Sequence, residues 1–243
     1  LQMCPFKALS VAGSNTETTL ETAALPHAPE VIDVPPVNSF RRPPRLSLAI
    51  RGVGGQGNLF FGKVLAQVAF LAGYDDRNIL KGETHGMAQM GGPVISTFGC
   101  GEVFSPALVP GTANVLIAME KAEALRPGFL DLLEPGGTAL MADTRILPHG
   151  LKPEAYPSDE AIAAQLEGYR VVTVDVLNIA LSLGDHKGRC ANVAMLGVLS
   201  TLPPFDVVPE AVWLQALKGI SRKPALWDLN HAAFMAGRGM QKG

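Results

Sequence analysis

Cysteine is scarce in this chain, and neither sign of charge dominates it. Cys4, Cys100 and Cys190 are far apart and odd in number, which argues against a disulfide framework and favours a reducing compartment. The formal net charge is only -2, and no basic run is interleaved with aromatic residues. Nothing therefore favours a nucleic-acid partner, and we expect a cytoplasmic protein.

Long apolar runs are also absent. The most apolar stretches are interrupted by Lys63 and Gln67, or by Pro203 and Pro204, so none reaches the roughly 18 residues that a membrane span needs. No cationic start followed by an apolar block suggests a signal peptide. With 243 residues, 47% of them hydrophobic and 17% charged, the chain can bury a substantial core. We expect no membrane contact, and one main domain with something smaller attached.

The smaller part lies at the beginning. Residues 11–44 are rich in Thr, Ser, Ala and Pro, with the segments ALPHAPE, DVPPVN and RRPP. Proline removes backbone donors and restricts the residue before it, so this segment is predicted to be an extended linker. The main domain is then expected over residues 45–243.

Strand and helix patterns alternate through the main domain. RLSLAIRGV is typical of a buried strand, and the spacing of apolar residues in NLFFGKVLAQVAFLAG is typical of a helix. Further strands are predicted at 93–101, 114–119, 137–143 and 169–176, and helices at 121–133, 159–167, 176–183, 190–200, 208–219 and 228–237. This alternation predicts an α/β, Rossmann-like fold with a mostly parallel sheet and helices on both faces.

A glycine-rich turn follows the first strand. Gly52, Gly54 and Gly57 in RGVGGQGN satisfy G-x-G-x-x-G between a strand and a helix, where backbone N–H groups can approach an anion. The acid that binds ribose in dinucleotide sites should end a second strand about 20 residues later. Asp75 and Asp76 have that offset, but no strand precedes them. An anion or cofactor contact is favoured over a dinucleotide site, and a tight packing turn remains the alternative.

A second glycine-rich stretch, GETHGMAQMGG, occupies residues 82–92. Its glycines make a poor helix, and nothing in it alternates like a strand. Glu83, His85 and Gln89 could hold a substrate, a cofactor or a facing subunit. The alternative is a surface loop whose methionines fill a neighbouring groove.

These stretches also carry a family resemblance. The segments GVGGQGNLFFGKVLAQVAFLAGY, GETHGMAQMGGPVIS, VFSPALVPG, ANVLIAMEKAEALR and LEPGG resemble the gamma-type catalytic domain of 2-oxoacid:ferredoxin oxidoreductases, with the indolepyruvate type nearest. GRCANVAMLGVLS and DLNHAAFMAG resemble the later helices of that family. The similarity runs from about Leu46 to the end. The family usually has arginine where this chain has Met90, so any role of that cation is not carried over.

The resemblance implies a reaction and its partners. It implies oxidative decarboxylation of indolepyruvate or another arylpyruvate, with coenzyme A taking up the acyl group and electrons passing through [4Fe-4S] clusters to ferredoxin. Thiamine diphosphate with its magnesium is expected on other domains or subunits of an oligomeric enzyme, because no GDG-then-NN signature occurs here. The expected contacts with cofactor, coenzyme A or a neighbouring domain are Gly54, Gly55, Gly57, Glu83, His85, Gln89 and Asn192.

The first residues, LQMCPFKAL, point to an iron–sulfur unit. Cys4-Pro5 resembles the last element of the ferredoxin pattern C-x2-C-x2-C-x3-C-P. Because the chain does not begin with methionine, we expect residues 1–10 to be the end of a ferredoxin-like segment, with Cys4 as a cluster ligand and the other cysteines upstream.

Two alternatives remain open on the sequence alone. The domain could be a nucleotide-binding regulatory or docking module without a reaction of its own, which binding of NAD or ATP would reveal. Within the family, the 2-oxo acid could also be phenylglyoxylate, pyruvate or a branched-chain acid.

Overall fold

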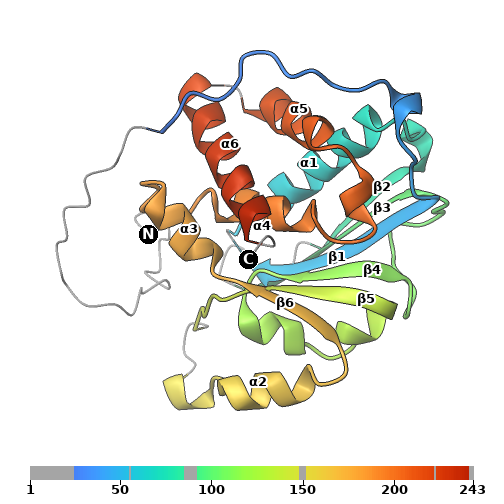
Figure 1. The fold of residues 1–243 in the computed structure, drawn as a ribbon. Coiled ribbons are helices and arrows are strands. Elements are labelled where there is room, and N and C mark those ends of the chain that lie inside the picture. The colour runs from blue at the N-terminus through green and yellow to red at the C-terminus, as the bar shows by residue number, and fades with distance from the viewer. Residues whose placement is uncertain (1–24, 55, 85–91, 148–151, 222, 241–243) are drawn as a thin grey trace.

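A six-stranded sheet in the order β2-β3-β1-β4-β5-β6 forms the centre of the molecule (Figure 1). The structure, a computed structural model, describes residues 25–54, 56–84, 92–147, 152–221 and 223–240. The strands are β1 (Arg45–Val53), β2 (Ile79–Thr84), β3 (Pro93–Gly101), β4 (Ala113–Ala118), β5 (Leu133–Ala142) and β6 (Arg170–Val174).

The sheet is mostly parallel, as the alternation of strands and helices predicts. The pairs β1–β4, β4–β5 and β5–β6 are parallel, whereas β3 is antiparallel to both β1 and β2. Only β3 therefore runs against the other strands of this sheet. The physical reason is the short connection between Thr84 and Pro93, which leaves no room for the crossover helix that a parallel pair requires.

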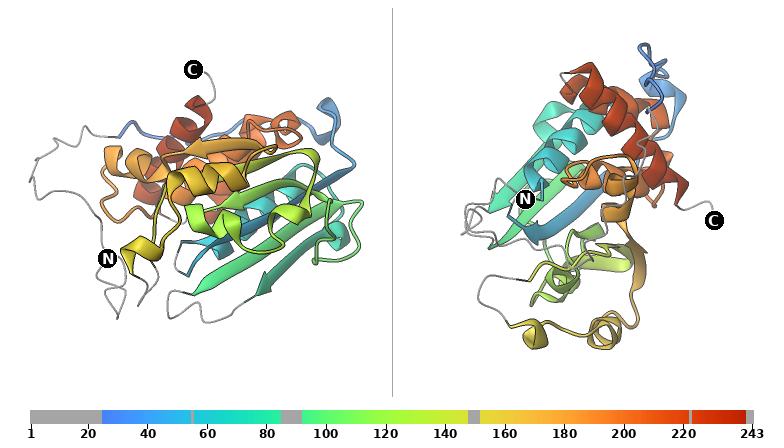
Figure 2. Two further views of the ribbon diagram at one scale, coloured as in Figure 1. Left: turned by 90° about the horizontal axis from the view of Figure 1, so that it is seen from below. Right: turned by 90° about the vertical axis from the view of Figure 1, so that its left-hand side faces the viewer.

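Helices cover both faces of the sheet, but unequally. They are α1 (Asn58–Leu71), α2 (Asp159–Gln165), α3 (Val176–Ser182), α4 (Ala191–Leu199), α5 (Glu210–Ile220) and α6 (Pro224–Gly239). Helices α1 and α3–α6 form a thick layer on one face, whereas α2 lies on the other (Figure 2). The larger core contains Ile50, Phe61 and Trp213, and the smaller one contains Phe129 and Ile162. Among the described residues, no helix is long and apolar enough to cross a membrane.

Two predicted elements need correction. The segment 121–133 forms two short 3-10 helices, Lys121–Leu125 and Leu130–Leu132, instead of one α-helix. Pro127 removes a backbone donor and Gly128 adopts φ 77° between them, and both features stop an α-helix.

The second correction concerns the glycine-rich stretch 82–92. Its first three residues, Gly82–Thr84, belong to β2, which lies at the edge of the sheet. An edge strand tolerates glycine and charged residues because only one side of it must pair. The predicted loop therefore begins as a strand.

Residues 25–44, the described part of the predicted linker, lie extended across the helical layer (Figure 1). At one end, the Ala28 N–H donates to Asp228 Oδ1 at 2.8 Å, and Trp227 Nε1 donates to the Pro29 carbonyl at 3.2 Å. At the other end, the Tyr74 hydroxyl donates to the Pro43 carbonyl at 2.7 Å. This segment is docked on the main domain through its own backbone groups.

Helices α4 and α6 cross with backbone in contact with backbone. A Cβ placed on Gly197 would lie 2.1 Å from the carbonyl oxygen of Phe234, and one on Gly237 would lie 2.0 Å from that of Ala194. No side chain fits at either position. The two glycines therefore set the distance between α4 and α6.

This crossing yields a stability prediction. Gly197→Ala should lower the free energy of unfolding by about 1–3 kcal/mol, because the added methyl group forces the helices apart. Gly219→Ala is the matched control, since Gly219 lies in α5 with nothing within 4 Å of its Cβ position. The control should be stabilised by about 0.5–1 kcal/mol through helix propensity. Urea denaturation measures both, and equal midpoints would contradict the crossing.

Candidate functional site

The site lies where the parallel strands β1 and β4 end. These neighbouring strands pair in register from Leu48–Val115 to Arg51–Ala118. The chain leaves β1 for α1 in the thick helical layer and leaves β4 for the 3-10 helix on the other face. Loops that diverge in this way open a crevice at the carboxyl ends of the strands, which is where ligands bind in open α/β sheets.

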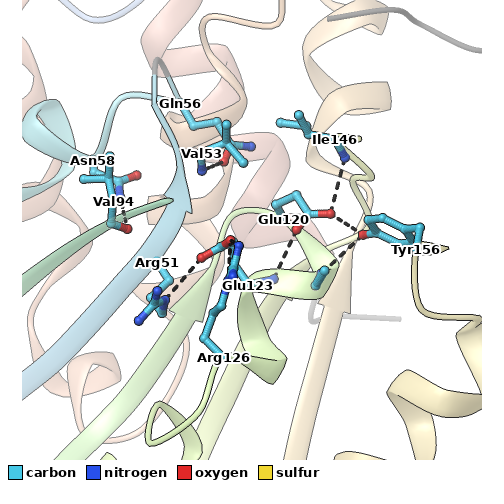
Figure 3. Close-up of polar contacts among 11 residues, drawn as sticks. Arg51, Val53, Gln56, Asn58, Val94, Glu120, Glu123, Arg126, Ile146 and Tyr156 are labelled. Atoms are coloured by element: carbon cyan, nitrogen blue, oxygen red, sulfur yellow. Dashed lines mark hydrogen bonds and ion pairs between the residues drawn. The ribbon is translucent and has the colours of Figure 1, made fainter. Parts of the chain in front are cut away.

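The glycine turn after β1 is fastened to β4 by one side chain. Gln56 Oε1 accepts the Val53 N–H at 2.7 Å (Figure 3). Gln56 Nε2 donates to the Met119 carbonyl at 2.7 Å. The Gly54 N–H donates to the Gly92 carbonyl at 3.0 Å. These bonds hold Gly54 and Gln56, on either side of residue 55, against the neighbouring chain segments.

Two buried asparagines adjoin this turn. Asn58 is the first residue of α1, and Asn192 is the second residue of α4. Their exposed fractions are 6% and 8%, and the Oδ1 atom of each has no hydrogen-bond partner among the described residues. Because buried polar atoms are nearly always paired, these acceptors call for a donor, which either ordered water or a bound ligand supplies.

Gly57 makes this arrangement possible. It adopts φ 84° as the N-cap of α1, and a Cβ there would lie 2.2 Å from Asn192 Nδ2. Only glycine suits both the left-handed backbone and the close approach of the asparagine. The described part of the turn, the start of α1 and Asn192 thus form a cradle of backbone groups and two amide side chains.

A buried carboxylate lies beside the turn, at the end of β4. Glu120 is 2% exposed and accepts hydrogen bonds from the Tyr156 hydroxyl, from the Ile146 N–H at 3.3 Å and from the Glu123 N–H at 3.1 Å (Figure 3). Burial raises the pKa of Glu120, and these hydrogen bonds oppose the rise. Burial and the bond to Glu120 also raise the pKa of Tyr156.

A second buried carboxylate, Glu123, is neutralised by arginines. Arg51 Nε donates to Glu123 Oε2 at 3.2 Å, and Arg126 Nε and a terminal nitrogen of Arg126 donate to Oε1 at 2.9 and 2.8 Å. The Glu123 side chain is only 3% exposed. A buried charge needs such partners, so this cluster ties β1 to the loop after β4.

A pocket of about 270 Å³ opens beside these two carboxylates. Its polar walls are Glu120, Glu123, Arg126 and Tyr156, and its apolar walls are Val53, Ala122, Leu125, Pro127, Ile146 and Pro157. This volume is slightly below the roughly 300–1,000 Å³ that is typical of ligand pockets. The pocket suits a small group of a ligand or a side chain of a partner protein.

Of the predicted site residues, the structure brings Gly54, Gly57 and Asn192 together at the turn. Glu83 lies apart from them on β2, beside Lys81 Nζ at 3.8 Å. Strand β3 separates β2 from β1, so Glu83 stands about 10 Å from β1 across two strand spacings. Glu83 therefore does not belong to the cluster of residues at the glycine turn.

The other predicted residues, Cys4, Gly55, His85 and Gln89, lie outside the described residues, as does Met90. Their expected roles remain predictions. Within the part of the chain that the structure describes, no group of three or more His, Cys, Asp or Glu side chains could hold a metal ion.

The arrangement does not match a dinucleotide site. Asp75 caps a 3-10 turn and pairs with Arg77 at 2.8 Å. The acid that does end the second strand is Glu83, but β2 is not the neighbour of β1. In dinucleotide sites the acid belongs to the second strand of the unit, which lies directly beside the first strand. Here β3 lies between β1 and β2, so Glu83 does not occupy that place.

Sequence reasoning missed Gln56 and Asn58 at the turn, and Glu120, Tyr156, Glu123 and its two arginines around the pocket. Glu120 had a usable signal, because it directly follows a buried strand where sites of this fold gather. Tyr156 had none, since it reaches Glu120 from 36 residues further along the chain.

Comparison with known proteins places this geometry in a family. The family model for pyruvate ferredoxin/flavodoxin oxidoreductases matches residues 47–240. The chain is 35% identical over 201 residues to the indolepyruvate oxidoreductase subunit IorB of Archaeoglobus fulgidus, covering 79% of this chain and 94% of that protein. It is 32% identical over 198 residues to IorB of Thermococcus kodakarensis, covering 79% and 93%.

Solved structures share the fold. The pyruvate oxidoreductase subunit PORC of Thermotoga maritima superimposes with a TM-score of 0.60 at 20% identity, covering 81% of this chain and 97% of that one. The 2-oxoglutarate:ferredoxin oxidoreductase of Magnetococcus marinus gives a TM-score of 0.60 at 20% identity, covering 83% of this chain and 32% of that one.

The buried Glu120 predicts a pH dependence of stability. Its pKa is raised above 4.5 on folding, so its contribution is full below that value and is lost as pH rises through the folded pKa. Glu120→Gln should lack this decline, whereas the exposed control Glu167→Gln should keep it. Urea denaturation across the acid to neutral range measures the slopes. A wild-type slope in Glu120→Gln would contradict the assignment.

Proposed function

Because this chain belongs to the pyruvate ferredoxin/flavodoxin oxidoreductase family, we propose that it is the gamma-type part of an enzyme that oxidises indolepyruvate or another arylpyruvate. In that reaction a 2-oxo acid, coenzyme A and oxidised ferredoxin give an acyl-CoA, carbon dioxide and reduced ferredoxin. The identity to two IorB subunits over more than nine-tenths of their length supports the substrate class. We place the enzyme in the cytoplasm.

The cradle at the glycine turn is the observation that carries a binding role for this chain. Because Gly57 has no side chain, Asn192 can lie against it. The Oδ1 atoms of Asn58 and Asn192 have no hydrogen-bond partner among the described residues. The N-termini of α1 and α4 both begin there, so the positive ends of two helices favour an anionic or polar ligand. A coenzyme A molecule offers both phosphates and amide donors. We assign its contacts to Gly54, Gly55, Gly57 and Asn192.

Thiamine diphosphate with magnesium and the [4Fe-4S] clusters belong, in this proposal, to partner domains or subunits. Thiamine diphosphate supplies the decarboxylation chemistry when bound, and the clusters carry electrons to ferredoxin. This chain supplies orientation: its glycine turn holds coenzyme A, and Glu83, His85 and Gln89 face a neighbouring domain or subunit. Cys4 is assigned to a cluster with cysteines from outside this chain.

The assembled enzyme provides the test of the reaction. Purified without oxygen and supplied with coenzyme A and thiamine diphosphate, it should reduce a viologen dye when indolepyruvate is added. Phenylglyoxylate, pyruvate and a branched-chain 2-oxo acid in parallel assays would rank the substrates, and we expect indolepyruvate to give the highest kcat/KM. If none of these acids leads to reduction of the dye, the proposal is wrong.

Asn192→Ala tests the cradle, with Asn230→Ala as the matched control. Asn230 is equally buried, but its Nδ2 donates to Ser221 Oγ at 2.8 Å, so its loss should cost about 1–3 kcal/mol of stability. Asn192→Ala deletes an unpartnered acceptor and should leave stability unchanged or higher. It should lower kcat/KM for coenzyme A at least tenfold, whereas Asn230→Ala should keep the activity of the folded enzyme. Unchanged kinetics in Asn192→Ala would remove Asn192 from the site.

A further inference from the structure

Helix α1 is apolar on the side that faces away from the core. Its outward stripe consists of Leu59, Lys63 and Phe70, of which Leu59 is 44% exposed and Phe70 is 59% exposed. Lys63 is the only charged residue of the whole helix. A surface helix normally carries a polar outer face, and one that is apolar nearly all round is normally covered on both sides.

Strand β2 lies directly under this helix and forms the edge of the sheet (Figure 1). The Cβ position of Gly62 in α1 is 3.6 Å from Lys81 Cδ and 4.0 Å from Glu83 Oε1. In the described part of the chain, β3 is the only strand paired with β2. The outer edge of β2 thus presents backbone groups that another strand can pair with.

The opposite face of β2 is flanked by a loop with an exposed aromatic residue. Pro106 packs on Gly82, whose Cβ position lies 3.3 Å from the Pro106 Cβ. Phe104, in the same loop, is 97% exposed. The edge strand therefore lies between two apolar flanks, one from α1 and one from this loop. Exposed apolar side chains on both sides of an edge strand favour an interaction site.

We propose that the edge of β2, with α1 above it, binds a second copy of this chain around a two-fold axis at Gly82. The two charged residues of β2, Lys81 and Glu83, favour a second copy as the partner. Lys81 and Glu83 project from the same face, on either side of Gly82. When two copies pair antiparallel with Gly82 opposite Gly82, each Lys81 stands opposite the other copy's Glu83.

The same charges exclude neighbouring registers. Pairing centred on Lys81 would oppose two lysines, and pairing centred on Glu83 would oppose two glutamates, both of which are unfavourable. A lysine on an edge strand usually prevents such pairing. Here an acid two residues away supplies its cross-strand partner, so the edge accepts a copy of itself while the lysine still discourages other strands.

If the two-fold axis is normal to the sheet, the second copy also covers the outward stripe of α1. Such an axis joins the two sheets into one and places both copies of α1 on the same face, side by side. Leu59 and Phe70 then pack against the other copy instead of facing water. An interface of this type uses the same patch on both copies, as two-fold interfaces must.

A charge swap tests the proposal. Sedimentation equilibrium of the 243-residue chain should show a dimer for the wild type. Lys81→Glu should raise the dimer dissociation constant at least tenfold, because a carboxylate of each copy then stands opposite the other copy's Glu83. The double variant Lys81→Glu with Glu83→Lys restores opposite charges in the same register and should restore the dimer.

Two outcomes would overturn the proposal. The first is that the wild-type chain stays monomeric at every concentration. The surface would then have to bind a different protein. The second is a dimer that Lys81→Glu leaves intact, or that the double variant fails to restore while remaining folded by circular dichroism. Lys81 lies at the surface with a side chain 34% exposed, so the single variant should fold normally.

Discussion

The backbone contact between α4 and α6 determines where the site can form. Gly197 and Gly237 let the two helices approach until each meets a carbonyl oxygen of the other. Asn192 lies on the same helix as Gly197, nearer its start, and reaches Gly57 at the mouth of the glycine turn. A helix held this closely cannot shift without breaking many contacts, because protein interiors are close-packed. The close packing of α4 against α6 at Gly197 and Gly237 therefore fixes the position of Asn192 in the cradle.

The two buried carboxylates at the end of β4 show how burial is tolerated in different ways. Glu123 has two arginines as partners, and its charge is balanced. Glu120 accepts its hydrogen bonds from neutral groups, namely the Tyr156 hydroxyl and two backbone N–H groups. These bonds replace part of the lost hydration but not all of it, so the pKa of Glu120 rises. Both carboxylates join segments that are distant in sequence and so hold the walls of the pocket in place.

The extended segment 25–44, which precedes the region matched by the family model, also holds the helical layer in place. It lies before residue 47, where the family match begins, and it bonds to α6 through Asp228 and Trp227. Proline leaves the carbonyl group available while removing the N–H, so a proline-rich segment can dock through its carbonyls without joining a sheet. The helical layer is therefore held from outside as well as by its own packing.

The sequence by itself determined the fold class, the first glycine turn and the positions of five of the six described strands, because local periodicity and turn chemistry act over few residues. It also carried the family resemblance, and the family match confirms that resemblance. The break of 121–133 at Pro127 and Gly128 and the antiparallel β3 have local causes that sequence reasoning overlooked. Only the tertiary structure decided that Tyr156 meets Glu120 and that Asn192 reaches Gly57. These two contacts join residues that are distant in sequence and depend on the packing of whole elements, which no local pattern contains.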